Sequence, residues 1–189
     1  GLDFGDLPYQ GTNAGYIKTS GLDLQLSYGF DTRFIGEESG IDVNVLLNHV
    51  FEYKTKELAD QPAIDYAGTV SVFGATLGGS VPKWKANVDV NFKLNDKFSL
   101  NSRARFIDGM VNRYSRIYIG EKSFTNVPSV WYFDFGAEMK IDGLTLRAGL
   151  NNAFDKQPPR YAPNVQSGTD PSLYDVIGRR FYVSANVKF

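Results

Sequence analysis

The stretch KWKANVDVNFKL, residues 83–94, alternates between polar and apolar side chains at every step. Its apolar members are Trp84, Ala86, Val88, Val90, Phe92 and Leu94, and its polar members are Lys83, Lys85, Asn87, Asp89, Asn91 and Lys93. A period of two residues is that of a β-strand whose two faces meet different surroundings. This stretch therefore predicts a strand with one apolar and one polar face.

The same alternation recurs in six other stretches of the chain. They are residues 22–30, 40–54, 98–106, 131–141, 144–150 and 181–189. No stretch repeats apolar residues at helical spacing over two turns. The sequence therefore predicts an all-β fold of about seven strands.

The connections between these strands alternate in length. Short ones lie near residues 35–40, at residues 95–97 and at Asp142-Gly143, a dipeptide that favours a two-residue hairpin. Long ones cover residues 55–81, 115–128 and 155–173. Short turns at one end and long loops at the other are typical of an antiparallel up-and-down transmembrane β-barrel.

Two interpretations of the apolar face are open. The face either packs into the dry centre of a soluble β-sandwich or small barrel, or it contacts lipid around a barrel with a wet interior. Apolar bands of about 9–11 residues favour lipid, because a tilted strand needs that length to cross a bilayer. Large rings also gather near the band ends, as interfacial aromatics do. At the long-loop end they are Phe51, Tyr53, Trp84, Trp131, Phe133 and Phe181, and at the short-turn end Phe92, Phe98 and Phe189.

The opposite face carries charges of both signs, as a hydrated interior permits. We expect two arginines of one strand to pair across strands with two carboxylates of another; these residues are Arg103 and Arg105, with Asp134 and Glu138. Unpaired backbone groups at the edges of an open sheet cost several kcal/mol each in lipid. We therefore expect further strands, either before Gly1 or from another chain. Residues 1–13 resemble the end of a preceding long loop.

Composition excludes several classes of function. Lys and Arg number 20 against 21 Asp and Glu, so the net charge of −1 excludes a strongly basic nucleic-acid binder. Cysteine is absent and His49 is the single histidine, so thiol nucleophiles and the usual zinc ligand sets are missing. Asp134 and Glu138 lie about 13 Å apart along a strand, too far for a pair of catalytic carboxylates. We expect no enzyme activity, no cofactor and no bound metal.

The end of the chain contains two motifs in order. The first is NNAFDKQPP from Asn151 to Pro159, and the second is YDVIGRRFYV from Tyr174 to Val183. They resemble the C-terminal strands of TonB-dependent outer-membrane receptors, in which an NLFDK-type segment precedes a YDxxGRxFY run and a terminal aromatic residue. Ala153 stands where that family usually has leucine, and residues 18–24 resemble the family's opening of a barrel strand. The matching residues are Asn151, Asn152, Phe154, Asp155, Lys156, Tyr174, Asp175, Gly178, Arg179, Phe181 and Phe189.

The resemblance implies a 22-stranded barrel in the bacterial outer membrane with a plug domain inside it. Residues 1–189 would be the C-terminal part of that barrel, with about the last seven strands, and the plug would lie upstream. The implied partners are outer-membrane lipid, the remaining strands and plug, the TonB complex through an upstream region, and the barrel assembly machinery through the C-terminal strand; nucleic acid is not among them. The implied function is energy-coupled uptake of a scarce ligand such as a ferric siderophore, cobalamin, haem or oligosaccharide.

The long loops are expected to capture that ligand, because aromatic rings stack on sugars and catecholates and arginine pairs with anions. Candidate contacts are Tyr66, Phe73, Tyr118, Phe124, Arg160 and Tyr161, although each could instead order its own loop. Two other classes stay open: a small outer-membrane barrel that acts as an adhesin or enzyme, and a soluble β-barrel or sandwich that binds a ligand. Solubility without detergent would favour the last.

Overall fold

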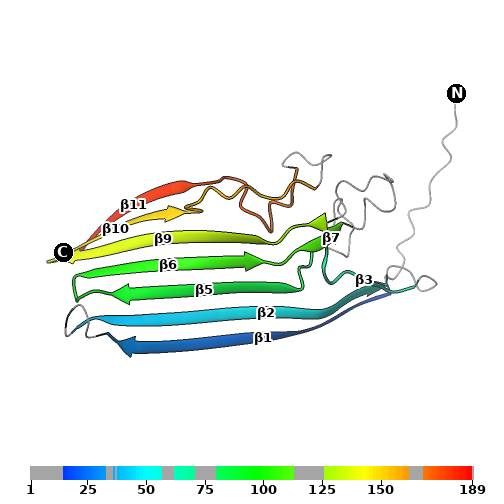
Figure 1. The fold of residues 1–189 in the computed structure, drawn as a ribbon, viewed down its shortest axis with the longest axis horizontal. Helices are drawn as coiled ribbons and strands as arrows, with labels where there is room; N and C mark the ends of the chain where they lie inside the picture. The colour runs from blue at the N-terminus through cyan, green and yellow to red at the C-terminus, as the bar shows by residue number, and fades with distance from the viewer. Residues whose placement is uncertain are drawn as a thin grey trace, which may run out of the picture.

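The computed structural model describes residues 15–32, 36, 38–56, 62–70, 80–112, 126–161 and 168–188. Seven long strands lie side by side in these residues (Figure 1). They are β1 (Tyr16–Asp31), β2 (Gly40–Lys56), β5 (Trp84–Lys93), β6 (Phe98–Ile107), β9 (Val130–Ile141), β10 (Leu144–Asn151) and β11 (Arg180–Val187). Four short strands accompany them: β3 (Ile64–Asp65), β4 (Thr69–Val70), β7 (Met110–Asn112) and β8 (Asn126–Val127). The all-β prediction is confirmed.

The long strands form one antiparallel sheet in the order β1-β2-β5-β6-β9-β10-β11, with β3 paired to β2. Each long strand pairs with the next long strand along the chain, so the predicted up-and-down order is also confirmed. Within the described residues, β1 pairs only with β2 and β11 only with β10. Each therefore presents one unpaired backbone edge. These described segments include no helix long and apolar enough to cross a membrane.

The short turns lie together at one end of the sheet (Figure 1). In the β5–β6 turn, the side chain of Asn95 accepts hydrogen bonds from the backbone N–H groups of Lys97 and Phe98, at 2.9 and 2.8 Å. Gly143, between β9 and β10, has a φ of +78°, which favours glycine. Both turns lie where the sequence predicts them.

The buried core lies at the other end of the sheet, among the long connections. There β4, β7 and β8 form a small three-stranded sheet. The buried apolar side chains are Val70, Ile107, Met110, Val127, Val130, Tyr132, Tyr161 and Tyr174, with Leu173 packed against them. The alternation pattern predicts neither the small sheet nor this core, because segments of two or three residues are too short to show a period.

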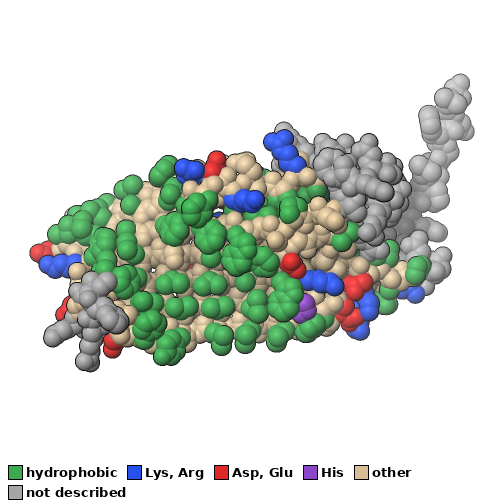
Figure 2. Space-filling model, in the orientation of Figure 1, with side chains coloured by type: hydrophobic (Ala, Val, Ile, Leu, Met, Phe, Trp, Pro, Cys, Tyr) green, Lys and Arg blue, Asp and Glu red, His purple; other side chains and the backbone are tan. Residues whose placement is uncertain are grey.

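One face of the long strands carries apolar side chains that nothing in the described chain covers. Figure 2 shows hydrophobic side chains over most of this apolar face. Trp84 is 38% exposed, Phe135 43% and Val187 55%. These side chains do not pack together in a dry centre, as a soluble sandwich requires. The opposite side of the sheet is called the polar face below.

A β-bulge in β2 exchanges the two faces near the loop end. Gly21 pairs with Val50 and Ser20 with Glu52, so Phe51 is an extra residue between them. Paired residues share a face, and Tyr53 pairs with Thr19, an odd-numbered residue of β1 on the polar face. The prediction that Tyr53 is one of the rings at the end of the apolar face in residues 40–54 is therefore wrong, because the bulge shifts the alternation by one residue.

Candidate functional site

Asn152 begins the last long connection and is fully buried. Its φ of +48° lies in the left-handed region, which Asn adopts more readily than most residues. The side-chain Oδ1 accepts a hydrogen bond from the backbone N–H of Lys156 at 2.8 Å, and Nδ2 donates to the Lys156 carbonyl at 3.0 Å. One amide side chain thus closes the turn 152–156, because it offers both a donor and an acceptor.

Asp155 joins the start of this connection to its end. Its carboxylate Oδ1 accepts a hydrogen bond from the backbone N–H of Arg179 at 3.0 Å. Gly178 has a φ of +83°, and a Cβ at this position would lie 2.8 Å from the same oxygen. Both the backbone conformation and the close approach therefore require glycine.

Two arginines and two aspartates fasten the connection to the sheet, and we call Arg105, Asp134, Asp175 and Arg180 the anchor network. Arg105 donates from Nε and Nη2 to the two carboxylate oxygens of Asp134, at 3.0 and 3.1 Å. Asp134 also accepts the backbone N–H of Asn152 at 2.8 Å. The carboxylate of Asp175 lies 4.0 Å from Arg105 and 3.4 Å from Arg180. The four charges balance, so the network joins β6, β9 and the start of β11 without a surplus charge.

Tyrosine rings pack beneath the anchor network. The hydroxyl of Tyr132 accepts the backbone N–H of Asp175 at 3.3 Å, and the Arg105 guanidinium lies 5.0 Å from the centre of the Tyr132 ring. Tyr161 and Tyr174 meet edge to face with ring centres 6.3 Å apart. Burial raises the pKa of both of these tyrosines above the ordinary value, so their hydroxyls stay protonated at neutral pH.

The predicted cross-strand ion pairs are confirmed in one case. Arg105 binds Asp134, but Arg103 donates to Asp89 of β5 instead. Arg103 is in register with both of these aspartates, and Arg105 and Asn152 already occupy the oxygens of Asp134. The other predicted carboxylate, Glu138, binds its neighbours on β10 and β9, which are Arg147 at 2.7 Å and Lys140 at 3.2 Å.

The motif residues that the sequence singles out fall into two groups. One group lies in the last connection and where it joins β10 and β11: Asn151, Asn152, Asp155, Lys156, Tyr174, Asp175, Gly178 and Arg179. Phe154 instead meets Phe133 and Phe135 edge to face, at 5.5 and 6.2 Å between ring centres, and Phe181 is exposed. Phe189 lies outside the described residues, and a role of this segment in barrel assembly stays a prediction.

The candidate ligand contacts differ in how far they reach solvent. Arg160 is exposed, Tyr66 is half-buried, and Tyr161 is 2% exposed within the loop core. The carbonyl of Tyr161 accepts a hydrogen bond from Asn112 Nδ2 at 3.1 Å. In this conformation Tyr161 supports the loop. Phe73, Tyr118 and Phe124 lie outside the described residues, and ligand contact by all six residues stays a prediction.

A groove of about 740 Å³ opens on the polar face below the last connection. Its polar lining comes from four long strands next to one another, from β9 and from the loop: Asp23, Gln25, Asn48, Lys85, Asn87, Arg105, Tyr132 and Ser172. Asn48 donates to Asp23 at 2.7 Å. Such a mixture of amides, hydroxyls and charges can hold a polar ligand by hydrogen bonds. Sequence reasoning missed the groove, since only the strand order brings these polar positions together.

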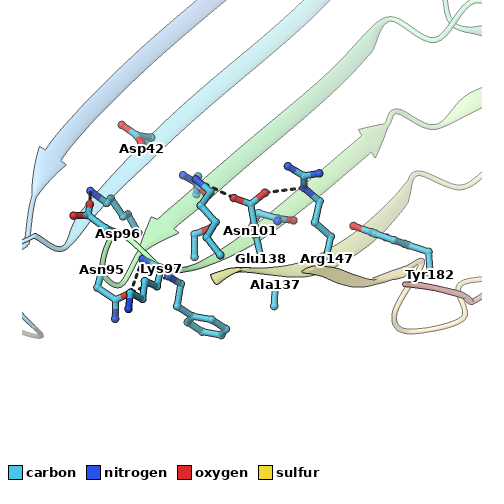
Figure 3. Close-up of a pocket in the computed structure, with 14 residues that line it drawn as sticks. Asp42, Asn95, Asp96, Lys97, Asn101, Ala137, Glu138, Arg147 and Tyr182 are labelled. Carbon is cyan, nitrogen blue, oxygen red and sulfur yellow. Dashed lines mark hydrogen bonds and ion pairs between the residues drawn. The ribbon is translucent and has the colours of Figure 1, made fainter. Parts of the chain in front are cut away.

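A second cavity, of about 280 Å³, lies at the short-turn end of the polar face (Figure 3). Glu138 lies there with its carboxylate toward Arg147 (Figure 3), while Asp96 accepts from Lys93. The charges of this cavity are thus largely paired with one another. In the part of the chain that the structure describes, no group of three or more His, Asp or Glu side chains could hold a metal ion.

Comparison with known proteins agrees with the sheet and its two faces. The sequence profile of the family described as "TonB dependent receptor-like, beta-barrel" matches residues 1–153. This match covers six of the seven long strands, whereas the motifs of residues 151–189 lie almost wholly beyond it. No curated protein and no solved structure matches the chain. Members of the matched family are outer-membrane receptors and transporters, and the chain belongs to this family of TonB-dependent receptor-like β-barrels.

Proposed function

We propose that this chain is part of an outer-membrane receptor that takes up a scarce ligand with energy delivered through TonB. The observation that carries the proposal is the two-faced sheet. Exposed rings and aliphatic side chains cover one face, while arginines, aspartates and asparagines line the other. A lipid-facing wall around a hydrated interior needs this division, and the family membership supports the same interpretation.

We further propose that residues 1–189 form the C-terminal part of a 22-stranded barrel. The free edges of β1 and β11 would each meet another strand, because unpaired backbone groups are costly in lipid. The plug domain would lie upstream in the sequence and would contact the polar face. The TonB complex would act through that upstream region, and the barrel assembly machinery would bind the C-terminal strand.

In the proposed barrel the short turns face the periplasm and the long connections face the outside of the cell. Arg160, Tyr66 and the groove of the polar face would then meet the ligand before it passes inward. The polar lining of the groove supports a ligand with many hydrogen-bonding groups, as in ferric siderophores, cobalamin, haem and oligosaccharides. None of the described residues favours one of these four.

Two measurements test the proposed function in the complete receptor. Cell fractionation and gel migration with and without heating are expected to place the protein in the outer membrane as a heat-modifiable barrel. Growth or uptake assays with ferric siderophores, cobalamin, haem and malto-oligosaccharides are expected to show one ligand that needs both the receptor and TonB. A freely soluble monomer without detergent, or uptake that persists without TonB, would contradict the proposal.

A further inference from the structure

A single row of paired residues crosses five neighbouring long strands on the polar face. Asn91 of β5 pairs with Asn101 of β6, and the row continues through Gly136 of β9 and Gly149 of β10 to Tyr182 of β11. Paired residues share a face, so these five residues lie side by side, and we call them the inner belt. At the usual spacing between strands, the inner belt is about 19 Å long.

Two glycines make the inner belt flat. A Cβ at position 136 would lie 2.6 Å from Asn101 Oδ1, so the amide of Asn101 lies over Gly136. A Cβ at position 149 would overlap the ring of Tyr182, and Figure 3 shows this side chain extended from β11 across the sheet. The amide and the ring thus lie over neighbouring strands, which are about 5 Å apart. Together they present an aromatic ring beside an amide and leave the space in front of the sheet open.

Two cavities of the polar face meet at the inner belt. The cavity of about 280 Å³ at the short-turn end and a further cavity of about 550 Å³ both have Asn91, Asn101 and Tyr182 in their linings. The second of these cavities shares Gln25 and Leu46 with the groove of about 740 Å³ below the last connection. Three hollows therefore follow one another along the same sheet, from the loop end to the short-turn end, and the inner belt lies on this path.

The inner belt carries no charge, although charged residues lie on both sides of it. Those residues are paired with one another: Asp89 with Arg103 and Asp134 with Arg105 toward the loops, and Lys93 with Asp96 and Glu138 with Arg147 toward the short turns. Asn91 and Asn101 are exposed, and their side chains make no hydrogen bond within the described residues. An amide offers donors as well as an acceptor, so the inner belt suits an uncharged group that forms hydrogen bonds.

We propose that the inner belt is a second, inner subsite for the compound that the receptor transports, an inference that rests on the proposed function. It binds uncharged hydrogen-bonding groups, with the amides of Asn91 and Asn101 as partners and the ring of Tyr182 as an apolar contact. A compound that leaves the groove below the loops loses its contacts there, and the inner belt replaces them on the way inward. Without these partners the compound has a higher free energy at this point of the path, so passage slows while capture at the groove is unchanged.

The test measures binding and uptake separately in cells that carry the complete receptor. The radiolabelled probes are ferrichrome, cyanocobalamin, haemin and maltoheptaose, and the probe that the native receptor takes up is followed. Asn91→Ala with Asn101→Ala should lower the maximal TonB-dependent uptake rate about fivefold, because neutral hydrogen bonds are lost. The dissociation constant of the same probe, measured in cells without TonB, should stay unchanged.

Two control variants accompany the alanine pair. Asn91→Gln with Asn101→Gln keeps both amides and should retain most of the uptake rate. Ser184→Ala lies on the polar face beside Arg147 but outside the three cavities, and it should transport the probe at the native rate. Heat-modifiable migration establishes that each variant is folded, and Asn101→Ala alone replaces the alanine pair if that pair fails to fold.

Three results would overturn the inner subsite. The first is a native uptake rate in the alanine pair. The second is an equal loss of rate and of binding affinity, which would assign the two asparagines to the outer groove. The third is entry of vancomycin without TonB, because the inner belt would then hold the plug in place. If the native receptor transports none of the four probes with TonB, the proposed function fails as well; a difference confined to the variants concerns the inner subsite alone.

Discussion

The two ends of the same sheet are stabilised in different ways. At the short-turn end, Lys93 and Asp96 are three residues apart and their paired side chains are 45% and 65% exposed. At the loop end, Arg105, Asp134 and Asp175 come from distant parts of the chain, and the two carboxylates are only 18% and 6% exposed. The short turns are therefore determined locally, whereas the loop end depends on long-range contacts between buried polar groups.

Asp134→Ala should give the largest effect, because it removes both Arg105 hydrogen bonds and leaves the Asn152 N–H without its acceptor. We expect the free energy of unfolding to fall by about 3 kcal/mol. Urea unfolding of the barrel in lipid vesicles measures it. The matched change Asp89→Ala on the same face removes a more exposed pair with Arg103 and should cost about 1 kcal/mol or less. Equal losses would show that the anchor network has no special role.

Gly178→Ala tests the joint between the two ends of the last connection, which is the contact of Asp155 with Gly178 and the Arg179 N–H. The new Cβ meets both an unfavourable φ and the Asp155 carboxylate, so we expect a loss of about 2 kcal/mol. The change should also speed protease cleavage within residues 155–179. Gly36→Ala, near the short-turn end, is the control because no atom of the described residues lies within 4 Å of the added carbon. If both variants unfold at the same urea concentration, the joint does not contribute to stability.

Tyr174→Phe should have a smaller effect that depends on pH. The buried Tyr174 hydroxyl has no hydrogen-bond partner among the described residues, so its removal at pH 8 should be neutral or stabilising by up to about 1 kcal/mol. Burial raises the pKa of Tyr174 in the folded state. The unfolded chain therefore loses this proton first, and the native protein loses stability as pH rises above about 10. The Tyr174→Phe variant should lose less; an identical pH dependence in both proteins would contradict this.

Asp96→Asn should give the smallest effect. Lys93 beside it holds the pKa of Asp96 below its usual range, so any stabilisation is present at neutral pH and fades as pH falls. Solvent screens this exposed pair, so we expect no measurable change in the urea midpoint at pH 7. A shift as large as that of Asp134→Ala would remove the contrast between the two ends.

Sequence reasoning predicted the long strands more completely than the contacts of the candidate site. The period of two in residues 83–94 is visible because each side chain on one face meets the same surroundings. The first strand is less visible: apolar alternation begins at Leu22, but β1 begins at Tyr16, since Lys18 and Ser20 continue the backbone pairing without apolar side chains. The predicted partner of Arg103 was wrong because both Asp89 and Asp134 are in register with it. Which of the two carboxylates binds Arg103 depends on the other contacts that each carboxylate makes.

By itself, the sequence determined that this protein is a meander of β-strands with one apolar and one polar face, because alternation and turn residues act over a few neighbouring positions. Tertiary structure alone decided the rest. A single extra residue at Phe51 turned Tyr53 to the polar face, and loop folding buried Tyr161 and Tyr174 against Tyr132. Bulges and loop cores arise from contacts between segments far apart in the chain, and such contacts leave no period in the sequence.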